Sequence, residues 1–184
     1  MNRLILSLLM SPLAAPAGEP AVTPAAQLIK LWKETKSLSA PEPVEKLRKG
    51  LDVEVGGAAT PRAVEVKVDA NSAASFLNVQ FELGSATLMG GTTTEQLTEI
   101  AKAMTAAGTR RFLIEGHTCD LGSDDSNFNL SRARALAVRS FLGGQGIDPA
   151  RLQVLGVGES DPSVANVDEA ARAQNRRVQI FLKL

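Results

Sequence analysis

The stretch Ile114–Val138, which reads IEGHTCDLGSDDSNFNLSRARALAV, decides how this chain folds. It begins in an apolar run, passes through an acidic loop bounded by Gly116 and Gly122, and enters a segment with apolar residues at helical spacing. The only His and the only Cys of the chain lie within it, at positions 117 and 119. The pattern predicts a strand, a polar loop and a helix in succession.

Composition sets limits on what this stretch belongs to. With 184 residues, of which 44% are apolar, the chain has room for one domain of ordinary size plus extensions. Lys and Arg together number 20, as do Asp and Glu, so we expect no general attraction to nucleic acid or to anionic membrane. A single Cys cannot form an intrachain disulfide, so Cys119 is either a free thiol or part of an intermolecular bridge.

The residues around this stretch predict strands and helices in the order βαβαββ. The prediction is an α+β two-layer sandwich, a mixed sheet with its helices packed on one face and at least one parallel strand pair. The last two strands are separated only by a polar segment, residues 168–174. The predicted elements are a strand at 75–83, a helix at 92–108, a strand at 110–115, a helix capped by Ser126 or Asn127 and ending at Gly143, and strands at 152–157 and 176–182.

The N-terminal part predicts export. Residues 1–17 combine a basic start, a short apolar run and a small-residue site at Ala15–Ala17, which is typical of a cleaved signal peptide. No Cys stands near Ala17 to carry a lipid anchor; an uncleaved interfacial anchor is the alternative. We therefore expect a protein that crosses the inner membrane into the periplasm, free or associated with the outer membrane or cell wall. Residues 18–73 are interrupted by prolines and predict a linker or docking segment with one short helix, before a domain at 74–184.

Arg134 is the residue most indicative of binding, because it lies within the apolar stripe of the central helix. A buried, unpaired guanidinium costs several kcal/mol, so Arg134 needs an acceptor. The acceptor is either internal, at Glu115, Asp120 or Asp125, or it is a carboxylate from a ligand, which the Arg fork holds bidentately. The N-terminus of the same helix offers further N–H donors, and a nearby acidic side chain would take an ammonium group. This set suits the zwitterionic end of an amino acid.

Several motifs together resemble the OmpA-like peptidoglycan-binding domain over residues 75–184. That family has a βαβαββ fold and is non-enzymatic, and it binds the diaminopimelate of the stem peptide, which anchors envelope proteins to the cell wall. The resemblance implies that Arg134 grips the diaminopimelate carboxylate, that Asn127 stands at the helix start, and that Thr118 lines the pocket. Leu130 and Arg176 match further family positions; a pairing of Arg176 with Glu159 or Glu169 is the alternative. The motifs are Gly116-His117-Thr118, Gly122, Asn127, Leu130-Ser131, Arg134-Ala135, Gly156, Gly158-Glu159, Pro162 and Asn175-Arg176-Arg177-Val178.

One position departs from the family pattern. The family usually reads Gly-His-Thr-Asp, with the Asp receiving the diaminopimelate amine, whereas this chain has Cys119 there and Asp120 next. A neutral thiol cannot form an ion pair with an ammonium group. Three outcomes are open: Asp120 turns inward and takes the role, the site binds more weakly, or the domain has another ligand. The last would make it a scaffold that docks to another envelope protein, with residues 18–73 as the docking segment.

Catalysis and metal binding are not expected. His117 and Cys119 have the spacing to share one side of an extended segment, but nothing in the sequence clearly supplies an orienting third group or an oxyanion hole. We interpret His117 as a buried ring hydrogen-bonded to backbone. Asp120, Asp124 and Asp125 lack the remaining features of a calcium loop, and one His with one Cys is too few for zinc. No cofactor is expected.

Overall fold

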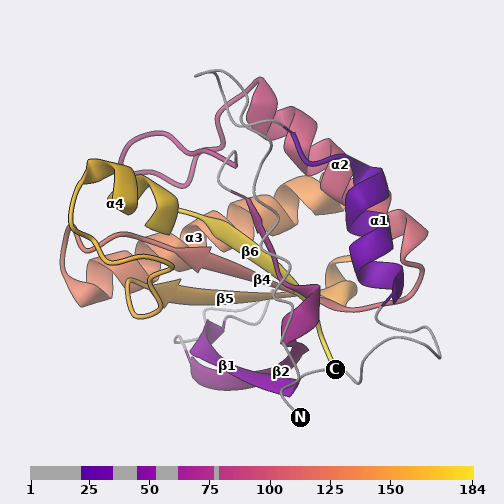
Figure 1. Ribbon diagram of the computed structural model, residues 1–184, viewed down its shortest axis with the longest axis horizontal. Coiled ribbons are helices and arrows are strands. Elements are labelled where there is room, and N and C mark those ends of the chain that lie inside the picture. The colour runs from indigo at the N-terminus through magenta and orange to yellow at the C-terminus, as the bar shows by residue number, and fades with distance from the viewer. Residues whose placement is uncertain (1–21, 35–44, 53–61, 77–78) are drawn as a thin grey trace, which may run out of the picture.

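The computed structural model describes residues 22–34, 45–52, 62–76 and 79–184 (Figure 1). The predicted signal peptide, residues 1–17, lies outside these ranges. None of the helices described is long and apolar enough to cross a membrane. In chain order the elements are α1 (Ala25–Glu34), β1 (Glu45–Asp52), β2 (Arg62–Asp69), the short 3₁₀ helix η1 (Ala70–Ser72), β3 (Ala74–Phe76), α2 (Thr92–Ala106), β4 (Phe112–His117), α3 (Asp124–Gly144), a second 3₁₀ helix η2 (Pro149–Arg151), β5 (Leu152–Gly158), α4 (Glu169–Asn175) and β6 (Val178–Leu182).

The strands form one mixed sheet in the order β2-β1-β5-β4-β6-β3. Strands β4 and β5 are parallel, as expected for strands joined through a helix, and the other neighbours are antiparallel. From β3 to β6 the chain follows the predicted βαβαββ order, so the α+β fold class is confirmed. The polar segment before β6 additionally forms helix α4, which is capped by Asp168, whose side chain accepts a hydrogen bond from the Ala171 N–H.

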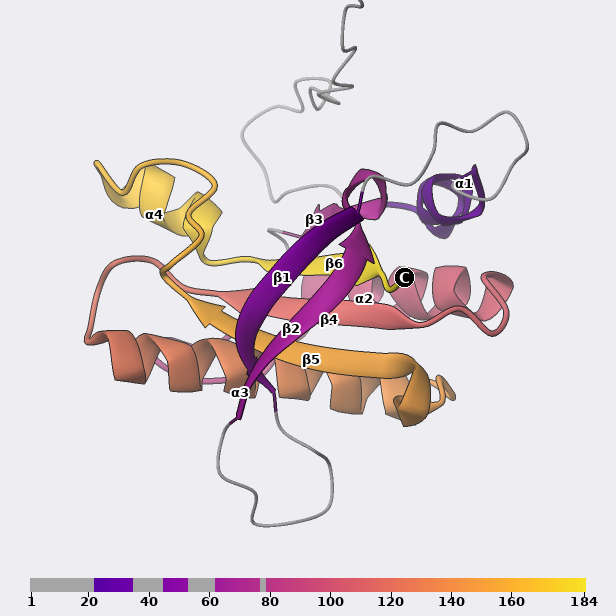
Figure 2. The ribbon, with the colours of Figure 1, turned by 90° about the horizontal axis from the view of Figure 1, so that it is seen from below.

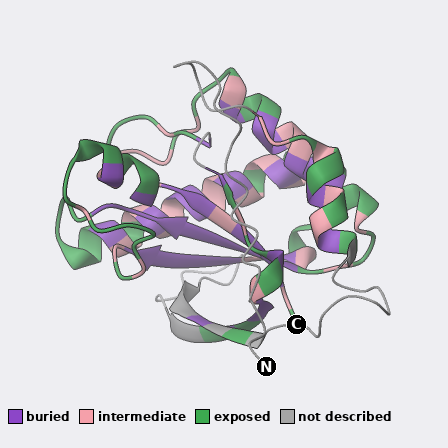
Figure 3. Ribbon diagram, viewed as in Figure 1, coloured by how far each residue is buried: buried purple, intermediate pink, exposed green. Residues whose placement is uncertain are grey.

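The main core lies between the sheet and helices α1, α2 and α3, which confirms helices on one face. Alternation along β4 sends Phe112 and Ile114 into this core, and the strands β4, β5 and β6 are almost wholly buried (Figure 3). Trp32 of α1 is fully buried, with its ring centroid 4.9 Å from that of Phe112, so α1 belongs to this layer. Helix α1 is also held to α2, because the Ala25 N–H donates to the Glu99 carboxylate at 2.7 Å.

The opposite face of the sheet is covered by the hairpin of β1 and β2, which crosses strands β4, β5 and β6 (Figure 2). A second, smaller core forms there from Val66, Val68, Leu113, Leu155, Val157 and Phe181. The prediction of a linker at residues 18–73 did not anticipate this, because β1 carries few apolar residues in EKLRKGLD. In β2 the alternation in RAVEVKVD was a usable signal of a half-buried strand.

Two predicted element boundaries were wrong. Among the described residues, the strand expected at 75–83 is present as β3 at Ala74–Phe76 and does not include residues 79–83, and Leu83, expected to face inward, is fully exposed at 103%. The reason is a turn at Gly84, whose φ is +63°, and across this turn the Glu82 N–H donates to the Thr87 carbonyl at 3.0 Å. Helix α3 begins earlier than expected, because Ser123 rather than Ser126 caps it.

Candidate ligand pocket

A cavity of about 730 Å³ opens where four parts of the chain meet. These are the loop between β3 and α2, the end of β4, the first half of α3, and α4 with the residues that follow it. The lining residues are Val79, Gln80, Phe81, Glu82, Leu83, Gly84, Met89, His117, Thr118, Cys119, Leu121, Asn127, Leu130, Arg134, Glu169, Ala173, Gln174, Arg176 and Arg177.

The structure brings most of the predicted site residues together. Thr118, Cys119, Asn127, Leu130, Arg134 and Arg176 all line the cavity, whereas Asp120 does not. The wall formed by residues 79–89 was not predicted, because residues 79–83 were interpreted as the end of a strand. Gly84-Ser85 and Gly90-Gly91, which bracket a short apolar segment, were the available signal of a folded loop.

Close contact between α3 and the sheet fixes where Arg134 lies. A Cβ atom on Gly116 of β4 would be 2.0 Å from the Ser131 carbonyl oxygen, and one on Gly156 of β5 would be 2.7 Å from Arg132 Cβ. Only glycine at these two positions allows the helix to approach so closely. The Ser131 hydroxyl adds a polar link, since it accepts a hydrogen bond from the Gly158 N–H at 2.9 Å. Arg134, one turn further along α3, is thereby carried to the cavity wall.

Arg134 is buried at 7% exposure but has only neutral partners. Its Nε donates to the Ser85 carbonyl at 3.1 Å, and its guanidinium carbon lies 5.1 Å from the Phe81 ring centroid. Among the residues that the structure describes, Arg134 forms no ion pair with a carboxylate. Burial lowers the pKa of Arg134, and the positive charge of Arg176 lowers it further. The internal salt bridge considered from the sequence, to Glu115, Asp120 or Asp125, is therefore not formed.

Asn127 and Thr118 shape the floor of the cavity. The Asn127 side-chain amide donates to the Cys119 carbonyl at 3.2 Å and also to the Glu159 carboxylate, so it ties the loop after β4 to the start of α3. Thr118 is 3% exposed, and its backbone N–H donates to the Gly158 carbonyl at 2.9 Å. Its hydroxyl has no hydrogen-bond partner within the described part of the chain. A buried hydroxyl that lines a cavity without a partner is available to a ligand.

The charges around Cys119 are engaged elsewhere. Arg176 bonds the Glu169 carboxylate at 2.6 Å and places Nη1 3.8 Å from the Cys119 sulfur. Burial lowers the pKa of Arg176, but its hydrogen bonds to Glu169 and Cys119 outweigh burial and raise it. The pairing with Glu169 was the alternative considered for Arg176, which nevertheless lines the cavity. Asp120 faces solvent, where the Arg172 Nε donates to its carboxylate at 2.8 Å and lowers its pKa. The expectation that Asp120 belongs to the site is not met in this structure.

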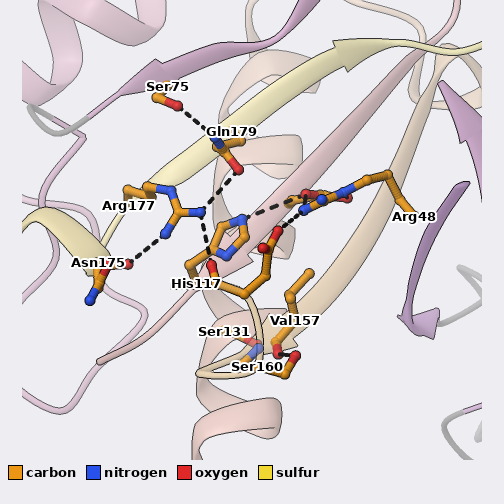
Figure 4. Close-up of polar contacts among 12 residues, drawn as sticks. Arg48, Ser75, His117, Ser131, Val157, Ser160, Asn175, Arg177 and Gln179 are labelled. Carbon is orange, nitrogen blue, oxygen red and sulfur yellow. Dashed lines mark hydrogen bonds and ion pairs between the residues drawn. The ribbon is translucent and has the colours of Figure 1, made fainter. Parts of the chain in front are cut away.

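Figure 4 shows a cluster of charged side chains around His117 and Arg177, two residues that also line the cavity. The Glu115 carboxylate, fully buried, accepts a hydrogen bond from the Arg48 Nε at 2.7 Å and lies 3.5 Å from the His117 Nε2. Arg48 also pairs with Asp161 at 2.7 Å. Arg177 is 5% exposed and donates to the Asp161 carbonyl at 3.0 Å. The sequence did not indicate Arg48, because pairing between strands far apart in the chain brings it here, and it placed Arg177 in a motif without assigning it a role in this cluster.

His117 is buried as expected, but its surroundings differ from the prediction. Neither ring nitrogen makes a hydrogen bond to a described residue; the nearest charged partner is Glu115 rather than backbone. Burial lowers the pKa of His117, and the positive charges of Arg177 and Arg48 add to this effect, while Glu115 offsets part of it. For Glu115, burial raises the pKa, but the nearby His117 ring and the hydrogen bond from Arg48 bring it below its ordinary value. The arrangement favours a neutral imidazole beside a charged carboxylate.

Together, the fold and the pocket define a small α+β domain with a buried arginine in the wall of a cavity. A model of the OmpA family matches residues 80–176, and the chain belongs to this family. It is 39% identical over 80 residues to the peptidoglycan-associated lipoprotein of Pseudomonas aeruginosa, an alignment that covers 44% of this chain and 47% of that protein. The chain spans about half the length of the curated relatives it matches.

Two solved structures show the same likeness. The peptidoglycan-associated lipoprotein from Burkholderia pseudomallei aligns with a TM-score of 0.51 and 28% identity, over 60% of this chain and 88% of that one. The cell wall anchor of the T6SS from Pseudomonas aeruginosa aligns with a TM-score of 0.50 and 26% identity, over 65% of this chain and 80% of that one. Both likenesses agree with the α+β fold described above.

Proposed function

We propose that this protein anchors a component of the cell envelope to the cell wall by non-covalent binding of peptidoglycan. The observation that carries the proposal is Arg134, a guanidinium buried in a cavity wall without a carboxylate among the described residues. A ligand carboxylate would supply the missing charge, and the planar guanidinium suits it geometrically. The printed names of the relatives, a peptidoglycan-associated lipoprotein and a cell wall anchor, support this choice of ligand.

Within peptidoglycan, the group we assign to the cavity is diaminopimelate of the stem peptide. Diaminopimelate carries a carboxylate on a side chain that extends away from the peptide, and such a group can reach Arg134. Thr118 would donate or accept a hydrogen bond through its unpartnered hydroxyl, while Leu130 would contact the aliphatic part. The role of Asn127 is to hold the loop at Cys119 in place. Arg176 lies close enough to Cys119 to add positive charge beside the carboxylate.

The envelope location follows from the same proposal. The ligand lies outside the inner membrane, which agrees with the signal peptide expected at residues 1–17. Helix α1, the most N-terminal element described, and α4, at the cavity, lie at opposite ends of the molecule (Figure 1). A component joined through the N-terminal segment would therefore leave the cavity open to the cell wall.

Sedimentation with purified sacculi tests the anchoring function. We expect the parent protein to sediment and Arg134→Ala to remain in the supernatant. Arg139→Ala is the matched control, because Arg139 lies on the same helix but donates to the Pro149 carbonyl away from the cavity. Failure of the parent protein to sediment would rule out the anchoring function.

Titration with two stem peptides tests the ligand. One contains diaminopimelate, and the other contains lysine, which lacks the extra carboxylate. Loss of one charged hydrogen-bonded contact is worth about 1.5–3 kcal/mol, so the lysine peptide should bind roughly tenfold or more weakly. Equal affinities would show that Arg134 does not hold this carboxylate.

A docking scaffold remains the second candidate. Leu83, Met89 and Leu121 are exposed large apolar residues, and all three line the same cavity. Exposed apolar patches of this kind mark surfaces for protein partners. This function predicts that the parent protein does not sediment with sacculi, and that Leu83→Ser with Leu121→Ser reduces capture of an envelope protein while Arg134→Ala leaves it unchanged.

A further inference from the structure

The charge in the cavity is unbalanced. Three arginines line it, Arg134, Arg176 and Arg177, but only two carboxylates do, Glu82 and Glu169. Glu169 is bound to Arg176, and Glu82 is an exposed residue of the loop between β3 and α2. The wall also presents the sulfur of Cys119, 3.8 Å from the Arg176 Nη1, and the neighbouring Asp120 is bound to Arg172 outside the cavity.

We propose that the cavity binds a carboxylate whose neighbouring nitrogen is acylated, and that a free ammonium group is not required. In the cell wall this is the diaminopimelate of a cross-linked stem peptide, whose second amino group is already joined to another peptide while its carboxylate remains free. The inference rests on the proposed function and specifies its ligand.

The electrostatics of the cavity disfavour an ammonium group at Cys119. An ammonium that enters beside a residue of 5% exposure loses hydration, and a thiol cannot replace that hydration with an ion pair. It would also lie close to Arg176, whose Nη1 is 3.8 Å from the Cys119 sulfur, so like charges would repel. An amide nitrogen is neutral, so it loses no charge hydration and is not repelled by Arg176.

A second observation indicates a neutral hydrogen-bonding ligand at the same place. The Thr118 hydroxyl is buried beside Cys119, lines the cavity and has no partner among the described residues. A hydroxyl can accept a hydrogen bond from an amide N–H, and a cysteine sulfur is a weak acceptor for the same donor. Thr118 and Cys119 thus form a neutral acceptor pair, whereas Arg134 provides the charge for the carboxylate.

Calorimetric titration of the full chain tests this inference with two forms of one stem peptide. In one form the free amino group of diaminopimelate is unmodified, and in the other it is acetylated. We expect acetylation to weaken binding by less than about threefold or to tighten it, because no ion pair is lost. Weakening by about tenfold or more in the parent protein would overturn the inference. Because the parent protein alone gives this result, the test does not depend on the folding of any variant.

Variants at position 119 then identify the residue responsible. Cys119→Asp places a carboxylate beside the ligand nitrogen and should make binding depend on the free amine by roughly tenfold, whereas Cys119→Ser should behave like the parent protein. If the parent needs the free amine and Glu82→Gln removes that need, Glu82 is the ammonium acceptor and the inference is wrong. If neither peptide binds the parent protein, the proposed function itself has failed.

Discussion

At the scale of single residues, we expect Arg134 to lower the stability of the fold and at the same time to provide a charge for ligand binding. Its side chain is buried among neutral groups, with the Ser85 carbonyl and the Phe81 ring as partners. Such partners compensate a desolvated charge only in part. A residue kept at a cost to stability is typical of a binding site, where the missing charge arrives with the ligand.

Replacing Arg134 by methionine should therefore separate the two roles. We expect Arg134→Met to raise the free energy of unfolding by about 1 kcal/mol, because a buried charge is replaced by an apolar chain of similar length. The same variant should lose binding to sacculi. Urea denaturation and sedimentation measure the two quantities. A variant that is less stable by a similar amount would indicate that Arg134 is mainly structural.

At the scale of elements, Arg48 attaches the β1–β2 hairpin to the sheet through two ion pairs. Arg48 of β1 contacts the buried Glu115 of β4 and also Asp161 in the loop after β5. We expect Arg48→Ala to lower the free energy of unfolding by about 3 kcal/mol or more, because Glu115 would remain buried without its cation. Urea denaturation measures the loss.

The control for Arg48 is a double variant. Adding Glu115→Gln to Arg48→Ala removes the orphaned charge and should recover part of the lost stability. A double variant that is less stable than Arg48→Ala would show that the hairpin is held mainly by the apolar contacts of Val66 and Val68.

Helix α1 should unfold together with the rest of the domain. Trp32 is fully buried, and its indole N–H donates to the Ser72 carbonyl at 3.2 Å. Trp32→Ala should cost about 3–5 kcal/mol, whereas Lys33→Ala, at an exposed position, should cost little. Trp32 is the only Trp in the chain, so its fluorescence reports on α1 alone. Fluorescence and far-ultraviolet dichroism that unfold at different urea concentrations would contradict this prediction.

The sequence predicted best those elements in which the repeat of apolar residues coincides with the residues that the fold buries. Helix α2 and strands β4 and β5 have the expected type and position, because each buries a face with a clear apolar repeat. Strand β1 was missed because it has no apolar pattern. Its Arg48 instead pairs with the buried Glu115, which is far away in the sequence. At the site, Thr118, Cys119, Asn127, Leu130, Arg134 and Arg176 line the cavity as a group, whereas Phe81 was not expected there, because a turn brings it to the cavity. Contacts of this kind depend on tertiary structure.

At the scale of the whole molecule, stability should depend on pH through one group between pH 7.5 and 5.5. His117 is the only His, and its pKa in the fold is lowered from 6.5. The unfolded chain therefore takes up a proton near pH 6.5 while the folded chain does not, so the stability present above this pH is lost as the pH falls. Glu115 and Asp161, whose pKa values are also lowered, lose their contributions only at more acidic pH.

We expect the free energy of unfolding to fall by up to about 1.4 kcal/mol between pH 7.5 and 5.5. Urea denaturation at the two values measures this change. In His117→Asn the fall should nearly vanish, whatever the absolute stability of the variant. A fall of equal size in the variant would assign the pH dependence to other groups.

The contact of α3 with the sheet at Gly116 and Gly156 has a consequence for how such a pocket can be altered. Neither residue lines the cavity, yet a single methyl group at Gly116 would meet the helix backbone at 2.0 Å. The helix would have to rise and would carry Arg134 with it. A library of variants selected for tighter binding would therefore lose every substitution at Gly116, although no ligand atom is near it. The distance between α3 and the sheet therefore determines the position of Arg134, and the two glycines, which lack side chains, determine that distance.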